Sequence, residues 1–425
     1  MQAITKCPRG TFDKLPADSY KYRFVENKAL VTAALYGYHE IRTPVFEHTE
    51  LFKRAVGDTT DIVGKEMYTF DDKKGRSLTL KPEGTAPVAR GVIENGLLND
   101  ALPLKLCYVT NCYRYEAPQS GRYREFTQFG AEVYGANTPL ADAELIALAV
   151  DLFDELKLPR ADYETQVNSI GCPDCRKAYH TALKEYYAQF AEKLCGDCTT
   201  RLERNPMRLL DCKVPSCAEF KNAAPVILDF NCEPCRDFFA KFRAALDLLK
   251  IPYTVNPKIV RGLDYYCNTV FEFVSKSGLV FGGGGRYNGL LKELGGVETP
   301  ASGFALGIER LVSLAETLAQ SALPCASPPD IYIGSMGDDA AAFALKLAHD
   351  LRRGGFEASC DIVGRSVKAQ MRFADKIGAG YSLIIGDNEL EQGKAALKNM
   401  VTKSSHEVAL KAEAIAGLLL GEKQQ

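Results

Sequence analysis

The chain has 425 residues, of which 46% are hydrophobic and 25% charged, a composition typical of a globular protein with two or three domains. Its net charge of −2 excludes a global positive field, so any nucleic-acid binding must depend on local basic patches. The N-terminus lacks an apolar signal core and no apolar run reaches membrane-spanning length, which predicts a cytoplasmic protein without a membrane partner. Its fourteen cysteines are then expected to be thiols or metal ligands rather than disulfides.

The first hundred residues predict a helix, short strands and one polar corner. Apolar residues at roughly helical spacing predict a helix from Ser19 to Leu35, and a turn separates it from the strand-like sequence EIRTPVFE. An alternating strand from Ser77 to Lys81 then leads through Glu83 and Thr85 into a predicted helix. This corner could grip a ligand, although Thr85 taken alone is more simply a helix N-cap.

The stretch from Leu104 to Gly135 predicts an antiparallel hairpin, with two strand-like runs around a polar loop at 116–123. Its arginines alternate with aromatic residues, which combines phosphate-binding guanidinium groups with rings that can stack on a base. These arginines are Arg114, Arg122 and Arg124. On the second strand, Gln128 and Glu132 are four residues apart, so they are expected on one face. The alternative is an exposed hairpin with solvated charges.

A cysteine-rich segment follows an amphipathic helix predicted from Ala141 to Leu156. Eight cysteines lie between residues 172 and 235, mostly with the Cys-x2-Cys spacing of zinc knuckles. They are Cys172, Cys175, Cys195, Cys198, Cys212, Cys217, Cys232 and Cys235. These thiolates could supply one or two structural zinc sites in a small inserted domain with little core of its own. The alternative is a set of reduced thiols that bind no metal.

Strand patterning resumes at Ile251, with Arg261, Tyr265 and Tyr266 ahead of a strand predicted from Thr269 to Val274. Four consecutive glycines at 282–285 then precede the sequence RYNGL. Glycine there allows close approach of the backbone to a ligand, and the alternative is a bulge or tight turn. The segment is neither a P-loop nor a dinucleotide-binding fingerprint.

The sequence GFALGIERL predicts a glycine-bearing strand that enters a helix. Arg310, in the first turns of that helix, can reach a phosphate or lie on an adenine face, and the alternative is a surface salt bridge.

The C-terminal part begins after 321–329, a segment rich in Pro, Ser and Ala that predicts a linker. Strands at 330–336, 356–362, 381–387 and 394–401 alternate with helices at 339–353, 367–377 and 411–420. This order predicts a small α/β domain with right-handed crossovers. Four basic residues recur there at helical spacing and form either a local basic patch or an ordinary solvated face. They are Arg365, Lys368, Arg372 and Lys376.

Taken together, these stretches resemble the bacterial histidyl-tRNA synthetases over nearly the whole chain. ALYGYHEIRTPVFEHTELF is similar to the dimer-forming first motif of class II aminoacyl-tRNA synthetases, YRYEAPQSGRYREFTQFGAEVYG to the second and GFALGIERL to the third. RGLDYY with TVFE, and GGGGRYNGL, resemble the signatures of histidine specificity. The resemblance implies an α/β and α+β multidomain fold. An antiparallel catalytic sheet with helices would span 1–165 and 246–320, interrupted by a cysteine-rich helical insertion at 166–245 and followed by an anticodon-binding domain at 330–425.

The resemblance also implies a role for each matching residue. Side chains that would bind histidine are Glu83, Thr85, Gln128, Glu132, Tyr265, Tyr266 and Tyr287. Side chains that would bind ATP are Arg114, Glu116, Arg122, Phe126 and Arg310, with Phe126 and Arg310 on the two faces of the adenine. Arg261 would approach the α-phosphate opposite Arg114 and stabilise the transition state, so Arg114 and Arg261 are the implied catalytic residues.

The implied activity is ATP-dependent attachment of L-histidine to tRNA(His) through histidyl-adenylate, by a homodimer that uses Mg²⁺. Two positions depart from the family pattern, Ala117 and Asn288, and both lie beside the matched residues, where they are expected to tune affinity. The alternative is a histidine-sensing regulatory paralogue that does not charge tRNA. Such paralogues typically lack the anticodon-binding domain, whereas residues 330–425 resemble that domain here.

Overall fold

The computed structural model describes residues 5–57, 60–117, 121–212, 214–259 and 261–423. The chain divides into two compact units, Met1–Pro324 and Cys325–Gln425, and the division falls inside the predicted linker at 321–329. Among the described residues, no helix is both long enough and apolar enough to cross a membrane.

The first unit is built on an eight-stranded sheet with the order β1-β5-β6-β11-β10-β9-β7-β8. Its strands are β1 (His39–Glu40), β5 (Leu104–Tyr113), β6 (Glu125–Tyr134), β7 (Tyr163–Ser169), β8 (Thr254–Val255), β9 (Cys267–Ser275), β10 (Val280–Arg286) and β11 (Ala301–Gly307). The inner pairs are antiparallel, and only the outermost pairs, β1 with β5 and β8 with β7, are parallel. The predicted antiparallel core and its hairpin are therefore confirmed.

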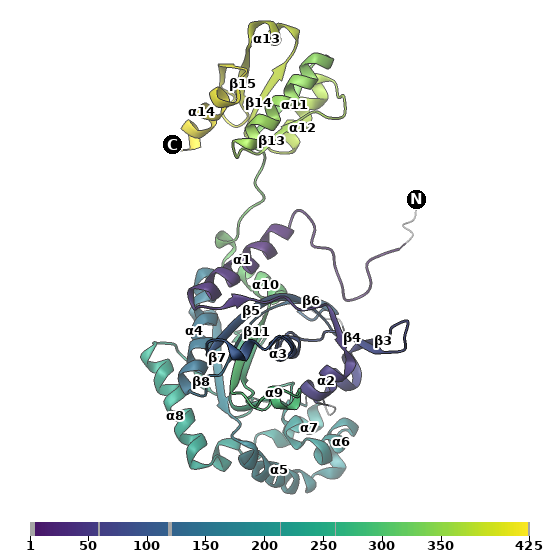
Figure 1. Ribbon diagram of the computed structural model, residues 1–425, viewed down its shortest axis with the longest axis vertical. Coiled ribbons are helices and arrows are strands. Elements are labelled where there is room, and N and C mark those ends of the chain that lie inside the picture. Colours follow the sequence, from purple (N-terminus) through teal and green to yellow (C-terminus); the bar gives the residue numbers. More distant parts are fainter. Residues whose placement is uncertain (1–4, 58–59, 118–120, 213, 260, 424–425) are drawn as a thin grey trace. The chain divides into compact units, whose positions relative to one another are not determined.

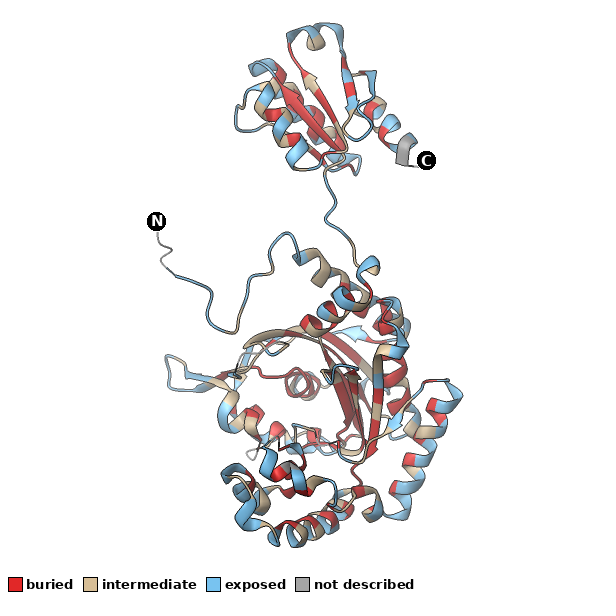
Figure 2. Cartoon of the chain, turned by 180° about the vertical axis from the view of Figure 1, so that it is seen from behind, coloured by how far each residue is buried: buried red, intermediate tan, exposed pale blue. Residues whose placement is uncertain are grey.

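Helices cover both faces of this sheet (Figure 1). One face carries α1 (Ser19–Leu35), α4 (Pro139–Glu155) and α10 (Ile308–Leu318), and the other carries α2 (Thr49–Val56), α3 (Thr85–Glu94) and α9 (Leu290–Glu293). A small sheet of β2 (Phe46–His48), β4 (Ser77–Leu80) and β3 (Tyr68–Asp71) lies beside α2. Figure 2 shows the central strands almost wholly buried, whereas the surrounding helices expose their outer sides.

The two faces of β6 pack into two different buried clusters. Phe129, Ala131 and Val133 join the hydrophobic cluster under α1 and α4, whereas Tyr134 joins the cluster under α2 and α3. Because side chains alternate along a strand, Gln128 and Glu132 share the face of Tyr134. The predicted common face of these two residues is confirmed.

The segment between β7 and β8 is helical. It contains α5 (Pro173–Ala188), α6 (Gly196–Arg204), α7 (Pro215–Ala218) and α8 (Glu233–Leu248), joined by short 3₁₀ turns. Tyr179 and Leu183 of α5 belong to the same buried cluster as Tyr265, in the loop before β9, and Val270 of β9. The cysteine-rich segment therefore packs directly on the sheet rather than forming a separate core.

The second unit contains a five-stranded sheet with the order β13-β12-β14-β15-β16. Its elements are β12 (Ile331–Ser335), α11 (Asp338–Arg353), β13 (Ala358–Cys360), α12 (Val367–Lys376), β14 (Tyr381–Ile385), α13 (Asp387–Gln392), β15 (Lys394–Asn399), β16 (Ser405–Ala409) and α14 (Ala412–Lys423). Residues Ile331 and Ile333 pack toward α11, whereas Tyr332 packs toward α12, so these two helices cover opposite faces. The predicted α/β order is confirmed, with α13 and β16 in addition.

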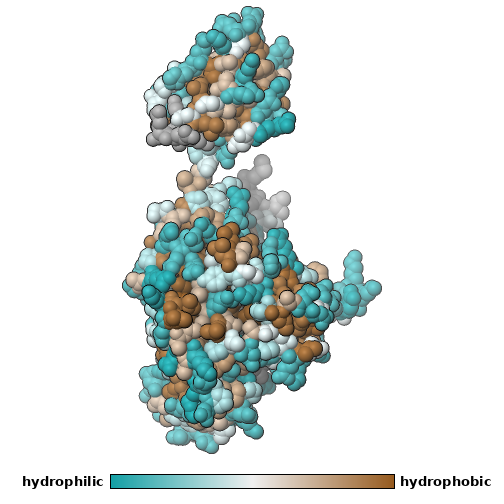
Figure 3. Space-filling view, turned by 60° about the vertical axis from the view of Figure 1, so that its left-hand side comes forward, coloured by the Kyte–Doolittle hydropathy of each residue, from teal (hydrophilic) through white to brown (hydrophobic). Residues whose placement is uncertain are grey.

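Apolar side chains also gather in patches on the surface, as the brown areas of Figure 3 show for one face. Among the exposed large apolar residues of the first unit are Val45 just before β2, Phe46 in β2 and Phe70 in β3.

Three predictions of detail are wrong. EIRTPVFE is not one strand but two, because Pro44 between β1 and β2 has no N–H for a ladder. Thr85 is not a helix N-cap, since Gly84 occupies that position and the Thr85 hydroxyl bonds elsewhere. Arg365 precedes α12, so only Lys368, Arg372 and Lys376 follow that helix.

Candidate active site

A cavity of about 410 Å³ in the first unit is lined by the start of α3, the strands β6, β9, β10 and β11, and the loop before β9. It brings together most of the residues that the sequence singled out. These are Glu83, Thr85, Arg114, Glu116, Arg122, Phe126, Gln128, Arg261, Tyr265, Tyr266 and Arg310. Glu132 and Tyr287 are not part of this lining and lie fully buried.

The corner between β4 and α3 is organised by the carboxylate of Glu83. It accepts hydrogen bonds of 2.8 Å from the backbone N–H groups of Thr85 and Ala86. These groups belong to the first turn of α3, where the helix itself provides no acceptor. Glu83 is 3% exposed, and burial raises the pKa of its carboxyl group. A buried carboxylate at the N-terminus of a helix can bind a cationic group of a ligand.

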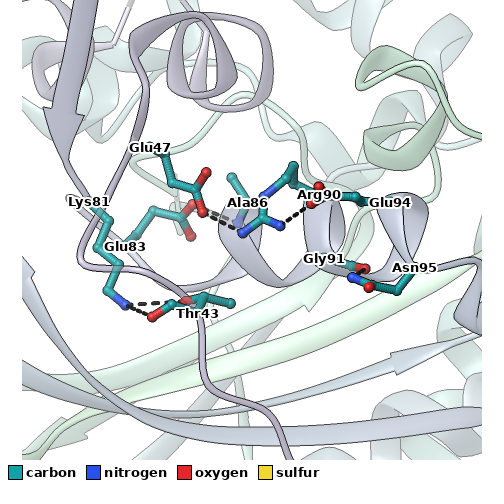
Figure 4. Close-up of polar contacts among 9 residues, drawn as sticks. All are labelled: Thr43, Glu47, Lys81, Glu83, Ala86, Arg90, Gly91, Glu94 and Asn95. Carbon is teal, nitrogen blue, oxygen red and sulfur yellow. Dashed lines mark hydrogen bonds and ion pairs between the residues drawn. The ribbon is translucent and has the colours of Figure 1, made fainter. Parts of the chain in front are cut away.

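Two basic side chains fix this corner to β2 and to the segment before it (Figure 4). The buried ammonium group of Lys81 donates to the backbone oxygen of Thr43 at 3.1 Å, and burial lowers the pKa of Lys81. Arg90 of α3 lies between Glu47 and Glu94, at 2.6 Å from each carboxylate. The backbone that presents Glu83 is therefore held from two sides.

Glu132 lies one layer behind the cavity wall. Its carboxylate accepts a hydrogen bond from the Thr85 hydroxyl at 2.7 Å and one from Tyr108 at 3.1 Å, and the Tyr287 hydroxyl also donates to it. Burial raises the pKa of Glu132 to about 8. The Thr85 hydroxyl, which lines the cavity, is thus hydrogen-bonded to a buried carboxyl group that can gain or lose a proton near neutral pH.

Aromatic rings close the same end of the cavity. Tyr265 and Tyr266 lie with ring centroids 4.7 Å apart, and the centroid of Tyr287 is 5.4 Å from that of Tyr265. Gln128 uses its side-chain oxygen to accept the N–H of Gly84 at 3.2 Å. This end of the cavity combines carboxyl, amide and phenol groups, which suits a small polar ligand.

The other end is rich in arginine. Arg114 donates to the Pro82 carbonyl at 2.8 Å, and its guanidinium lies 5.3 Å from the centroid of Phe126. Arg310 donates to the carbonyls of Gly121 at 2.7 Å and Val280 at 2.5 Å. Because these bonds fix the guanidinium planes in advance, the arrangement is ready for phosphate oxygens and a planar base.

Arg122 and Glu116 complete this polar end. The guanidinium of Arg122 is 3.3 Å from the carboxylate of Glu116 and 42% exposed, so it remains open to a ligand. Residues 118–120 of the predicted polar loop lie outside the described residues.

Arg261 enters from the loop before β9. It donates to Glu272 at 2.5 Å; burial opposes its positive charge, but that carboxylate raises the pKa of Arg261 further. A Cβ atom at Gly283 would lie 2.7 Å from the Arg261 guanidinium and 2.6 Å from the Phe271 carbonyl. The glycine run lies in strand β10 rather than in a tight turn, with a register shift against β9 at each end of it, and it leaves room for this arginine.

Other lining residues had no assigned role in the sequence. Glu272 is the last residue of the segment TVFE, and its position on the strand that follows Arg261 could have indicated a place in the cavity. Arg208 comes from the cysteine-rich segment, and no local pattern marks it. Asn288, one of the departures from the family pattern, accepts hydrogen bonds from the Ala301 N–H at 3.2 Å and from Arg286 at 3.3 Å.

Comparisons with known proteins identify the family. The family model described as histidyl-tRNA synthetase matches residues 10–167 and 231–311, and the anticodon binding domain model matches 330–418. The histidine--tRNA ligase of Clostridium novyi is 53% identical over 418 residues, covering 98% of this chain and 99% of that protein. That of Caldanaerobacter subterraneus is 49% identical, with coverages of 96% and 98%.

Solved structures agree. The crystal structure of apo histidyl-tRNA synthetase from S. aureus superposes with a TM-score of 0.81 at 39% identity, covering 97% of this chain and 99% of that one. The chain therefore belongs to the histidyl-tRNA synthetase family.

Proposed function

We propose that this chain is a histidine--tRNA ligase, which activates L-histidine with ATP and transfers it to tRNA(His). The observation that carries the proposal is a single cavity with carboxyl and phenol groups at one end and preorganised arginines at the other. Relatives about half identical over nearly the full chain bear the name histidine--tRNA ligase. Nothing favours the regulatory paralogue. A place in the cytoplasm, where charged tRNA is used, is part of the same proposal.

In this proposal, histidine binds at the end of the cavity near α3. Glu83 faces the α-ammonium group, with Thr85 and Gln128 beside it, and Tyr265 and Tyr266 close the other side of the imidazole ring. Glu132 and Tyr287 act from behind this wall, because Glu132 accepts a hydrogen bond from the Thr85 hydroxyl and the Tyr287 ring packs on Tyr265. Because these polar groups are left unpaired by an apolar isostere, such an analogue is rejected strongly.

ATP occupies the arginine-rich end. Arg114 binds the α-phosphate, Arg122 the terminal phosphates and Glu116 the adenine amino group, while Phe126 and Arg310 bracket the base. Mg²⁺ prefers oxygen ligands and is usually held by substrate phosphates with one or two carboxylates. The cavity carboxylate of Glu66 fits that role, and the ion would neutralise phosphate charge.

The chemistry then needs positioning and charge stabilisation rather than a protein nucleophile. A carboxylate oxygen of histidine attacks the α-phosphorus as the bond to pyrophosphate breaks, and Arg114 and Arg261 stabilise the charge on the α-phosphate oxygens. A 3′-terminal ribose hydroxyl of tRNA then attacks the acyl carbon, and AMP leaves. The nearby thiol of Cys112 is fully buried, which raises its pKa to about 12, so it stays neutral and unreactive.

Pyrophosphate exchange into ATP, measured with each of the twenty amino acids, tests the activation step. Exchange with histidine alone, together with charging of tRNA(His), is expected. If histidine binds but neither exchange nor charging occurs, the proposal fails in favour of the regulatory paralogue.

Arg261→Ala tests the assigned catalytic role. We expect exchange to fall by about 10²–10³-fold, the usual effect of removing one preorganised donor to developing charge. Stabilisation against heat by histidine should persist, which separates lost catalysis from lost folding. Arg160→Ala, at a side chain that is 44% exposed and outside the family motifs, is the matched control and should exchange normally. Near-normal exchange by Arg261→Ala would contradict the role.

A further inference from the structure

The eight cysteines between residues 172 and 235 form two separate groups of four. Site 1 is Cys172, Cys175, Cys232 and Cys235, and site 2 is Cys195, Cys198, Cys212 and Cys217. Within each site all four sulfur atoms lie within 4.8 Å of one another. The sequence left the partition open, since nearby pairs can combine in several ways.

The sulfur separations match a single tetrahedral ion. Sulfur atoms are 3.5 Å apart between Cys172 and Cys175, 4.0 Å between Cys175 and Cys235, and 3.8 Å between Cys195 and Cys212. Four sulfurs around zinc at about 2.3 Å form a tetrahedron with edges of about 3.8 Å. An iron–sulfur cubane would require the sulfurs to spread around four irons.

Backbone donors also favour thiolates at both sites. The N–H of Cys232 points to the Cys175 sulfur at 3.1 Å, and the N–H of Cys195 points to the Cys217 sulfur at 3.2 Å. Such N–H bonds to ligand sulfurs are the outer contacts that orient and stabilise metal thiolates. In each site a helix also begins directly after a cysteine, which adds a favourable dipole for negative charge.

We propose that each site binds one zinc ion, and that the two ions together position the segment from Arg261 to Asn268, which comprises the loop before β9 and the first two residues of β9. This segment carries Arg261, Tyr265 and Tyr266, so the positioning role depends on the proposed function, whereas the metal sites do not. The closing experiments separate the two.

Site 2 holds the segment 261–268 at its first half. The segment Asn205–Asp211 lies between the ligands Cys198 and Cys212, so zinc would fix it at both ends. From this segment the Asn205 amide donates to Asp264 at 3.0 Å, and the Arg208 guanidinium donates to the Gly262 carbonyl at 2.6 Å.

Site 1 holds the segment 261–268 at its second half. Arg176, next to the ligand Cys175, donates to the Tyr266 carbonyl at 2.9 Å. The N–H of Asn268 donates to the Gly171 carbonyl at 2.9 Å, and its side-chain oxygen is 3.5 Å from the Cys235 sulfur. Both ends of the segment 261–268 are thus bonded to residues adjoining a four-thiolate site.

Metal content of the purified full-length protein tests the sites. Elemental analysis should give two zinc ions per chain for the wild type, and one for Cys175→Ser and for Cys198→Ser. Cys325→Ser, at an exposed cysteine outside both sites, should keep two. No bound metal, iron in place of zinc, or disulfides within the two sites would each overturn the proposal, and the wild-type value decides even if a ligand variant fails to fold.

Two variants that leave all eight cysteine ligands unchanged test whether the two metal sites position the segment from Arg261 to Asn268. Arg208→Met and Arg176→Met should keep two zinc ions and raise the KM for histidine in exchange by about fivefold or more, with the KM for ATP nearly unchanged. Arg204→Met, an exposed arginine one residue before the segment Asn205–Asp211, should match the wild type. If both variants behave like that control, the positioning role fails while the metal sites stand. If the wild type shows no histidine-dependent exchange, the proposed function fails instead.

Discussion

The carboxyl group of Glu132 is fully buried, yet three hydroxyl groups surround it as hydrogen-bond donors. The donors favour the charged form, but loss of water around the group is the larger effect and raises the pKa to about 8. A glutamate ordinarily titrates near 4.5, so the folded protein holds a proton between these two values that the unfolded chain has lost. The free energy of unfolding is therefore expected to fall as the pH rises from 4.5 through 8.

Glu132→Gln should remove this pH dependence. Thermal denaturation of both proteins should be measured from pH 5 to pH 9. As the pH rises, the free energy of unfolding of the wild type should fall relative to that of the variant by on the order of a few kcal/mol, because each unit of pKa difference corresponds to about 1.4 kcal/mol. Glu94→Gln, at an exposed position on α3, is the control and should run parallel to the wild type. Parallel curves for Glu132→Gln as well would show that Glu132 does not carry the raised pKa.

At the scale of elements, the glycines of β10 reflect the close packing of this strand against its two neighbours, β9 and β11. Gly282–Gly285 pair with both β9 and β11, and a Cβ atom at Gly284 would lie 2.1 Å from the Gly303 carbonyl. The close approach of backbones here, rather than a turn, requires glycine. The same absence of side chains opens the space that Arg261 occupies.

Gly283→Ala should therefore weaken catalysis through Arg261. The added methyl group meets the Phe271 carbonyl and the Arg261 guanidinium, so we expect exchange to fall by about tenfold or more, with a lower melting temperature. Gly289→Ala is the matched control, because the nearest atom to its Cβ would be 3.8 Å away and its φ of −81° suits any residue. Equal activity of the two variants would exclude steric control by β10.

Helix α12 presents Lys368, Arg372 and Lys376 at intervals of four residues, all exposed. These charges supply a local basic surface on a chain with a net charge of −2. We expect reversal of Lys368 and Arg372 to Glu to raise the KM for tRNA about tenfold in aminoacylation, with pyrophosphate exchange unchanged, because phosphate contacts dominate RNA affinity. Reversal of Lys346 and Arg353 on α11, which covers the opposite sheet face, is the control. An equal effect of both reversals would indicate nonspecific charge.

At the scale of the whole molecule, the proposed homodimer is testable by mass. One chain is 46.7 kDa, so light scattering should give about 93 kDa, twice that value. The first motif includes Phe46, which is 50% exposed beside Val45 and near Phe70, an arrangement that favours burial against a second copy. Phe46→Glu should shift the mass toward one chain, whereas Leu248→Glu, at an exposed apolar residue of α8, should not. A wild-type mass near 47 kDa would contradict the dimer.

The sequence by itself determined what depends on neighbours along the chain. Helix α1 has the predicted ends, the hairpin of β5 and β6 has the predicted place, and Gln128 and Glu132 share a face. These features follow from the periods of helices and strands and from turn residues, which are local. The family motifs added the order of the binding residues, most of which line one cavity.

Only the tertiary structure decided which distant groups meet. Cys175 lies beside Cys232 rather than beside Cys195, which is nearer in sequence. Arg208 reaches the cavity from the cysteine-rich segment, and Glu132 lies behind Thr85 rather than in the wall. These arrangements depend on how helices and strands far apart in sequence pack into a shared core. No local period encodes that packing, because its energy comes from surfaces that come together only when the chain is folded.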